Sequence, residues 1–474
     1  MSADLGEMFQ ALGRQADALP LPGAAAARRR GRRRTWTTAA VSAAAAVVLV
    51  LVGVGFAVRN PHPRAAKPAA TPAGPPVVGT VSLGTGDIVT ANVAQDGRRA
   101  YTTWIRREDN TGWVIAADLT TGKQAWPARQ VVDPQRTVEQ ILVVPSAVLV
   151  FTRAWNGSQP ERGLFAFDPA TGAPLWDRGA AAEESLVVTD AMLVRSSRQD
   201  GVVEGLDWRT GARRWRADLS ADRPLRTLGM TVAADEERID RSGPRADLTD
   251  GRVVVVTVAG KVQVRDAATG AVTRNTSVPV GSGDTMAAYR GWLFSHDEAD
   301  DNGGPYHLRA TDLTGNTGSA VIAAVPGRFI TLAGCGPNRV CVITVRKPDG
   351  AGTVLTALDA AQRRLLWETA SKYGGDQIST ARGYTMLHAP DGGYELFDAK
   401  GTRIFTADLS TGWLDAGTLL IYAPDGTGRW ARWSIADRKL RPIGPPPEQT
   451  GNCASTTNLV ICPTPNGLTI WRVK

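Results

Sequence analysis

The apolar and polar positions of this chain divide it into two unlike parts. From Val77 to the C-terminus, short apolar runs alternate with turn residues, a pattern typical of β-strands joined by hairpins. Runs such as 148–151 and 253–258 are candidates for buried strands. Before this region, residues 39–58 form one long uncharged apolar segment. The pattern therefore predicts a β-rich region preceded by a single membrane-spanning helix.

An eleven-residue motif repeats within the β-rich region, at residues 116–126, 166–176 and 205–215. Its consensus is Ala/Gly-x-Asp-x-x-Thr-Gly-x-x-x-Trp. The Asp can accept hydrogen bonds from the turn backbone, and the Gly supplies the positive φ that a tight hairpin needs. Each copy predicts a strand, a turn and a second strand ending in a Trp that stacks on the neighbouring unit. The repeat residues that we assign are Asp118, Gly122, Trp126, Asp168, Gly172, Trp176, Asp207, Gly211, Trp215, Asp359 and Trp367.

Fainter copies of the motif continue towards the C-terminus. They contain Asp266, Asp312, Asp359 and Asp398, and a last degenerate copy lies at 433–437. From Asp118 to Asp398, successive Asp positions are 39 to 59 residues apart. A period of about 40–50 residues with four strands per unit is the sequence signature of a β-propeller. We expect an all-β propeller of about eight four-stranded blades, with seven as the alternative; a literal count gives eight or nine units.

The two ends of the β-rich region can share one blade. Residues 453–473 supply about three strands after the last motif, and residues 77–83 supply a fourth. Pairing between these segments would close the ring and remove an exposed sheet edge.

The repeat resembles the tryptophan-docking motif of pyrroloquinoline-quinone-like (PQQ-like) propellers, over roughly residues 77–474. That family includes quinoprotein dehydrogenases and the non-enzymatic scaffold lipoproteins of outer-membrane assembly, and the chain resembles the scaffold type more closely. The resemblance implies the fold, and it leaves the function to be argued from sites.

The residues before the propeller predict a membrane anchor. Residues 1–37 are a basic tail with six clustered arginines, residues 38–58 a transmembrane helix, and residues 59–76 a Pro/Ala-rich linker. The long basic region favours a signal-anchor over a cleaved signal peptide. The excess of cations before the helix predicts a cytoplasmic N-terminus and an extracytoplasmic propeller at 77–474, hence a single-pass protein of the cell membrane. The tail itself is either disordered or a docking helix for a cytoplasmic partner.

The charge distribution argues against nucleic-acid binding. The chain has a net charge of +8, but +4 lies in residues 1–37 and +3 in residues 38–76, which leaves +1 for the propeller. The excess cations flank the apolar segment, so they indicate its orientation in a membrane and not a surface for nucleic acid. The bias of 46 Arg to 8 Lys is typical of a GC-rich bacterial genome, and we expect an actinobacterial one.

The four cysteines fall in two close pairs, Cys335 with Cys341 and Cys453 with Cys462. Each pair brackets a turn before an apolar strand, which predicts two hairpin disulfides in an oxidising compartment. Zinc is the competing interpretation, but the spacings are not those of zinc ligands and no His lies near.

The sequence predicts no catalytic residue and no cofactor. It lacks the adjacent cysteine pair and the calcium and base motifs of quinoprotein dehydrogenases, and only His296, His307 and His388 fall in the propeller, the last read as structural. One acidic stretch is a weak calcium candidate, with a solvated hairpin tip as the alternative. Its residues are Asp297, Glu298, Asp300 and Asp301.

These observations predict a membrane-tethered extracytoplasmic propeller that binds or scaffolds protein, peptide or cell-envelope ligands. Two alternatives remain open: a quinone-dependent dehydrogenase-like enzyme, and a transmembrane sensor that relays to a cytoplasmic partner through the N-terminal tail. The sequence identifies neither the ligand nor the oligomeric state.

Overall fold

The computed structural model describes the chain in segments. They are 75–84, 88–132, 136–156, 159–181, 184–189, 191–231, 249–279, 285–297, 305–315, 318–346, 352–375, 377–389, 393–408, 411–415, 417–422, 430–444 and 453–473. The predicted tail at 1–37, the transmembrane helix at 38–58 and the linker up to residue 74 lie outside these residues. Within the described segments no helix is long and apolar enough to cross a membrane. All regular structure in them is β-strand.

The strands follow one another as antiparallel four-stranded units, which we call blades 1 to 8 in chain order. Blade 1 is β2 (Ile88–Gln95), β3 (Arg99–Arg106), β4 (Gly112–Asp118) and β5 (Gln124–Val132). Blade 2 is β6 (Arg136–Val144), β7 (Ala147–Asn156), β8 (Gln159–Phe167) and β9 (Pro174–Ala181). Blade 3 is β10 (Ser185–Val188), β11 (Leu193–Ser197), β12 (Val202–Leu206) and β13 (Arg213–Asp218). Blade 4 is β14 (Pro224–Thr231), β15 (Thr249–Thr257), β16 (Lys261–Asp266) and β17 (Val272–Ser277).

The second half of the chain repeats this arrangement. Blade 5 is β18 (Met286–Tyr289), β19 (Trp292–His296), β20 (Tyr306–Asp312) and β21 (Ser319–Val325). Blade 6 is β22 (Arg328–Gly336), β23 (Arg339–Val345), β24 (Thr353–Asp359) and β25 (Arg364–Ala370). Blade 7 is β26 (Gln377–Ala381), β27 (Tyr384–His388), β28 (Tyr394–Phe397) and β29 (Arg403–Ala407). Blade 8 is β30 (Thr411–Asp415), β31 (Thr418–Tyr422), β32 (Trp430–Ser434) and β33 (Leu440–Gly444).

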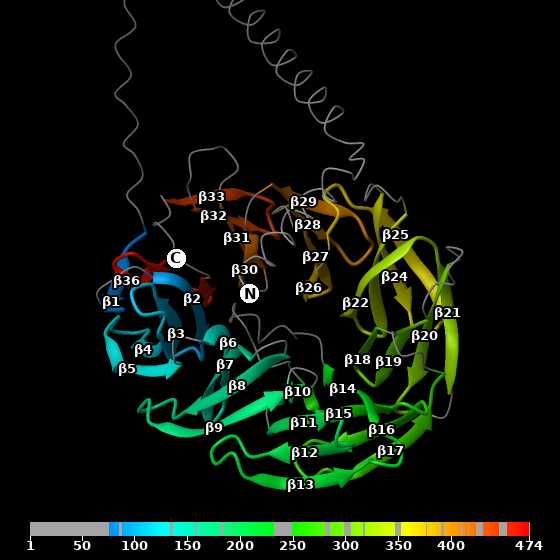
Figure 1. The fold of residues 1–474 in the computed structure, drawn as a ribbon. Coiled ribbons are helices and arrows are strands. Elements are labelled where there is room, and N and C mark those ends of the chain that lie inside the picture. The colour runs from blue at the N-terminus through cyan, green and yellow to red at the C-terminus, as the bar shows by residue number, and fades with distance from the viewer. Residues whose placement is uncertain are drawn as a thin grey trace, which may run out of the picture. The chain divides into compact units, whose positions relative to one another are not determined.

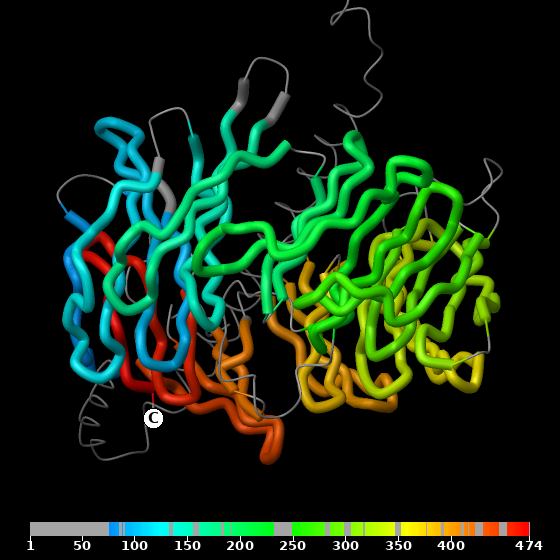
Figure 2. Tube along the Cα trace, turned by 90° about the horizontal axis from the view of Figure 1, so that it is seen from below, coloured from blue at the N-terminus to red at the C-terminus, as the bar shows by residue number. Residues whose placement is uncertain are grey.

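A closing blade combines the two ends of the propeller. It contains β34 (Ala454–Ser455), β35 (Leu459–Thr464), β36 (Gly467–Arg472) and, beside β36, the first strand β1 (Val77–Val81). Strands β1 and β36 are antiparallel, with Thr80 opposite Thr469. The predicted pairing of the chain ends is therefore present. Figure 1 shows the blades side by side around a ring, and in Figure 2 the blue start of the propeller runs beside its red end.

The predicted propeller of about eight blades is confirmed. The number of blades depends on whether hydrogen-bonded sheets or four-stranded units are counted. Hydrogen bonds join the described strands into eight sheets, seven with four strands and one with eight. The larger sheet is blades 4 and 5, joined by one parallel pair between Thr231 and Tyr289. Counted as four-stranded units, the described strands make nine. The Asp-containing turns number eight because the closing blade, assembled from both chain ends, has none.

The hydrophobic core is divided among the interfaces between adjacent blades. Buried valines and leucines of one sheet pack on those of the next: Leu149 of blade 2 and Leu206 of blade 3 share one such cluster. The ring closes in the same way, since Val93 of blade 1 packs with Ile470 of the closing blade. Such interfaces hold each blade chiefly through its two neighbours.

Candidate functional site

The Asp of each repeat organises the turn between the third and fourth strands of its blade. In blade 1, Oδ1 of Asp118 accepts hydrogen bonds from the backbone N–H of Thr120 at 3.0 Å and of Thr121 at 2.8 Å, and from the Thr121 hydroxyl at 3.0 Å. Gly122 follows with φ of 68° and donates its N–H to the Asp118 carbonyl. Asp168 and Asp207 make the same contacts in blades 2 and 3.

The Trp of each repeat packs on the turn glycine of the next blade. A β-carbon added to the glycine would lie 2.4 to 2.8 Å from the indole, so that only a glycine leaves room for the ring. The four Trp–Gly pairs are Trp126–Gly172, Trp176–Gly211, Trp215–Gly270 and Trp367–Gly401. The indole N–H of Trp176, Trp215 and Trp367 also donates to a backbone carbonyl of the next turn, at 2.7, 2.8 and 3.1 Å.

At two of the interfaces that lack a repeat Trp, other contacts take its place. At the corresponding position of blade 4 stands Arg274, whose Nη1 donates to the Thr314 carbonyl of blade 5 at 3.1 Å. At the ring closure, the backbone of Gly79 in β1 lies directly against the backbone of Gly122. An added β-carbon on either glycine would lie about 2.5 Å from the backbone of the other. At the position of the Trp–Gly contact, the closing blade therefore docks on blade 1 through two glycines.

We expect the repeat carboxylates to make the propeller sensitive to acid. Hydrogen bonds from the backbone and hydroxyl of Thr121 lower the pKa of Asp118 below its usual value. A carboxyl whose pKa is lowered by folding stabilises the native state above the unfolded pKa of about 3.9, and this contribution is lost as pH falls through the folded value. The thermal midpoint of the wild type should therefore decrease when the pH is lowered below about 4. The midpoint of Asp118→Asn should decrease less steeply over the same pH range, and equal slopes would contradict the stabilising role assigned to the Asp118 carboxylate.

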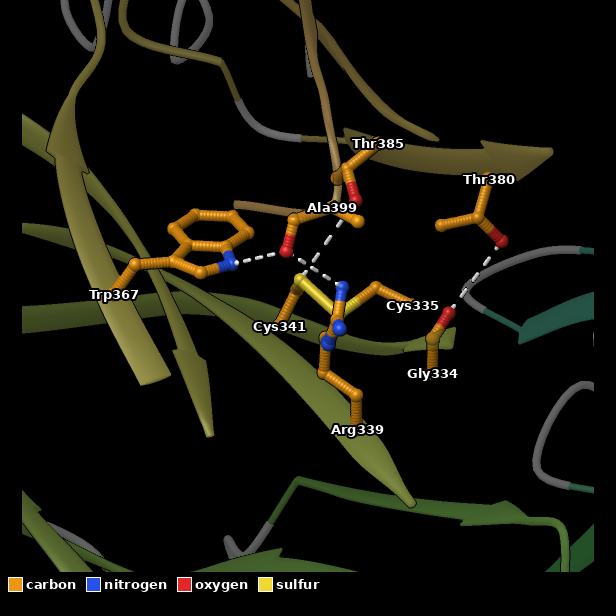
Figure 3. The surroundings of a disulfide bond; sticks show 8 residues. All are labelled: Gly334, Cys335, Arg339, Cys341, Trp367, Thr380, Thr385 and Ala399. Atoms are coloured by element: carbon orange, nitrogen blue, oxygen red, sulfur yellow. Dashed lines mark hydrogen bonds between the residues drawn. A yellow bond between two sulfur atoms is a disulfide. The ribbon is translucent and has the colours of Figure 1, made fainter. Parts of the chain in front are cut away.

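Both predicted disulfides are present. Cys335 and Cys341 join β22 to β23, and Cys453, directly before β34, is joined to Cys462 in β35. Figure 3 shows the first bond beside Arg339 and Trp367, which both donate to the carbonyl of Ala399 in blade 7 at 3.1 Å. This disulfide thus fixes the hairpin that carries Arg339 to the interface between blades 6 and 7.

The disulfides predict a thiol count and a stability change. The unreduced, denatured protein should show no free thiol, and reduction should expose four. Replacing both Cys335 and Cys341 by serine should lower the free energy of unfolding by about 2 kcal/mol, since the closed loop is short. Thiol titration and urea denaturation measure these effects. Free thiols in the unreduced protein would contradict the pairing.

The calcium candidate is only partly within the described residues. Glu298, Asp300 and Asp301 lie outside them. Asp297 contacts His307, whose backbone N–H donates to Oδ1 at 2.6 Å and whose Nδ1 lies 3.0 Å from Oδ2. The described part of the chain holds no group of three His, Cys, Asp or Glu side chains placed to bind a metal.

The structure brings together one Ser–His pair that the sequence did not indicate. Oγ of Ser379 lies 2.8 Å from Nε2 of His388 within blade 7, because β26 and β27 are paired. The same oxygen accepts a hydrogen bond from Nε1 of Trp413 in blade 8 at 3.3 Å. This arrangement links two blades, and we assign it a structural role.

A cleft of about 640 Å³ opens across blades 2, 3 and 4. It lies where β10, with four residues, is flanked by β6 with nine and β14 with eight. Its volume is in the range of ligand-binding pockets, roughly 300–1,000 Å³. Three consecutive inner strands therefore supply one continuous site.

The lining of the cleft combines apolar side chains with polar and charged ones. The buried apolar side chains are Leu142, Phe151, Val188 and Leu225. The polar and charged side chains are Glu139, Gln140, Arg162, Glu184, Ser185, Ser196, Arg198 and Arg226. None of these residues belongs to the repeat motif, which explains why a search for motifs did not find them.

A chain of ion pairs borders the cleft on its blade 3 side. Arg195 lies 2.5 Å from Glu184 through two of its nitrogens and 3.0 Å from Glu204 through a third. Glu204 also accepts from Arg178 of blade 2 at 3.1 Å. Hydrogen bonds to Glu184, opposed by burial, raise the pKa of Arg195, so its guanidinium stays charged. The two carboxylates, both buried, are thereby compensated.

Comparison with known proteins supports the class of fold that the blades define. Residues 110–321 match the family described as outer membrane protein assembly factor BamB. Within these residues the repeats are similar to those of BamB-like propellers, as the docking motif predicts. No curated protein sequence matches the chain.

Solved structures with similar folds share little sequence with the chain. BamB from Moraxella catarrhalis is 17% identical, with a TM-score of 0.40, over 72% of this chain and 96% of BamB. The computationally designed Ika8 protein is also 17% identical, with a TM-score of 0.43, over 72% of this chain and 97% of Ika8. A eukaryotic initiation factor is 11% identical, with a TM-score of 0.52, over 83% of this chain and 92% of the factor. This last likeness shows the fold alone.

Proposed function

We propose that the protein is a membrane-tethered extracytoplasmic propeller that binds protein, peptide or cell-envelope ligands in the cleft of blades 2 to 4. The cleft carries the proposal, because it is a site of ligand size built on three strands of a rigid ring. Residues 38–58 would anchor the protein, with residues 1–37 in the cytoplasm and the linker 59–76 outside. The protein would act by binding, without catalysis.

Three observations support this assignment. The two disulfides fit an oxidising compartment outside the cytoplasm. The BamB-like repeats relate the propeller to a protein named for its part in outer membrane protein assembly. Trp–Gly contacts dock four of the blades on their neighbours, so that loops and strand ends at the rim are presented by a fixed frame.

Site-specific photocrosslinking in cells tests the binding function. A photoreactive phenylalanine would replace Leu186, which lines the cleft, or Arg328, an exposed arginine of the strand β22 in blade 6. We expect discrete crosslinked products from position 186 and none in common from position 328. Identical products at both positions, or none at either, would contradict a ligand in the cleft.

Protease accessibility tests the tether. In intact cells stripped of their wall, added protease should digest the propeller and leave an epitope at residue 1 intact. Digestion of the epitope with protection of the propeller would show the opposite orientation, and release of the protein by a salt wash would refute the anchor.

A further inference from the structure

We propose that the cleft recognises an extended acidic peptide segment, with its apolar side chains on the apolar part of the lining and its carboxylates on Arg198 and Arg226. This inference rests on the proposed binding function and gives the chemical class of the ligand.

The acidic side chains of the cleft are already engaged by arginines. Glu139 lies 2.5 Å from Arg153 and 4.0 Å from Arg162. Both carboxylate oxygens of Glu184 contact Arg195 at 2.5 Å. A ligand cation would have to displace these pairs, and the one at Glu184 is buried. The cleft is therefore poorly suited to basic ligands.

Two of its arginines are not engaged in this way. Arg198 follows the end of β11 and Arg226 lies near the start of β14, so they come from blades 3 and 4. Both are exposed, and neither has an acidic partner among the residues that the structure describes. The planar guanidinium group binds carboxylates through two parallel hydrogen bonds. These two side chains therefore bring positive charge to the lining that no described carboxylate compensates.

The rest of the lining favours a peptide over other anions. Leu142, Phe151 and Leu225 line the cleft with apolar side chains, which suit the apolar residues of a peptide. Gln140 and Ser185 also line it and have side chains that both donate and accept hydrogen bonds. An extended peptide backbone presents alternating N–H and C=O groups and needs both kinds of partner, whereas a fatty acid has no such groups.

Binding of defined peptides to the purified full-length chain tests the proposal. The probe is a fluorescein-labelled heptapeptide of alternating leucine and aspartate with blocked ends. Arg198→Ala and Arg226→Ala should each weaken its binding about tenfold, as the loss of one charged pair predicts. Both substitutions are at exposed positions and should leave the thermal midpoint unchanged. The affinity of the wild type should fall as salt is raised.

The controls separate this site from general surface charge. Arg328→Ala removes an exposed arginine from another inner strand and should not change the affinity. Heptapeptides of alternating leucine and lysine, or of serine and aspartate, should bind at least about tenfold more weakly, since each lacks one of the two required features. Equal losses in all three arginine variants, or equal binding of the lysine peptide, would overturn the proposal.

Competition by a fatty acid and comparison with the crosslinking experiment complete the test. Dodecanoate should compete weakly for the peptide site; competition as strong as that of unlabelled peptide, with the same dependence on Arg198 and Arg226, would overturn the peptide assignment. Crosslinks from position 186 without binding of the acidic peptide would refute the ligand class and leave the binding function standing. Failure of both would refute the cleft as a binding site.

Discussion

Replacing Arg195 with alanine should lower the free energy of unfolding by about 3–5 kcal/mol, as expected when one partner of a buried ion pair is removed. Arg195 is the shared partner of Glu184 and Glu204, whose side chains are 5% and 7% exposed. Without the guanidinium, two carboxylates would remain in a poorly solvated space. Urea denaturation measures the loss, and the thermal midpoint should fall in parallel.

Neutral replacements of the two carboxylates provide the control. In a background of Glu184→Gln and Glu204→Gln, removal of Arg195 leaves no buried negative charge. The same Arg195→Ala substitution should then cost much less than in the wild type, because the two effects are coupled. If the cost is equal in both backgrounds, the ion pairs do not account for the stability.

Trp215→Ala should destabilise the propeller by about 3 kcal/mol, near the lower limit for truncating a buried Trp. The indole packs on Gly270 of the next blade and donates its N–H to the Ala267 carbonyl at 2.8 Å. Truncation removes both contacts and opens the interface between blades 3 and 4. Gly270→Val should have a similar effect from the other side, because its added atoms would overlap the ring and its φ of 73° disfavours a side chain.

Two variants show whether the Trp–Gly contact is responsible. Trp215→Phe keeps an aromatic ring on the glycine and loses the hydrogen bond. Its stability should therefore lie between those of the wild type and Trp215→Ala. Val272→Ala, at an exposed position of β17, should be nearly neutral. A loss at Val272 as large as that at Trp215 would mean that the outer strand, and not the docked indole, sets the stability. Thermal unfolding measures the stability of both variants.

The fold could be predicted because its information is local and repeated. Asp118 and Gly122 specify a turn within five residues, and the Trp four positions later identifies the outer strand. One copy of this motif would predict only a hairpin, but its repetition along the chain predicts a propeller. The cysteine pairs were equally local, since each spans one hairpin. The closing blade was found from its apolar runs and had no turn to count.

The cleft could not be predicted because its residues are far apart and carry no motif. Glu139, Glu184 and Arg226 come from three blades, and each belongs to an ordinary strand or strand end. Their proximity depends on the short length of β10, which sequence patterns fix poorly. The Ser379–His388 contact was missed for a similar reason, since it depends on the register of β26 against β27.

The contact between Gly79 and Gly122 gives the closing blade a mechanical role. Any tension carried along the chain from residues before Val77 reaches the ring first at β1, which is secured by its ladder to β36 and by the backbone approach of these two glycines. A bulkier residue at either position would push this strand outward and weaken the clasp between the first and last segments of the ring. Resistance to pulling at the N-terminal end should then depend on two residues that have no side chain.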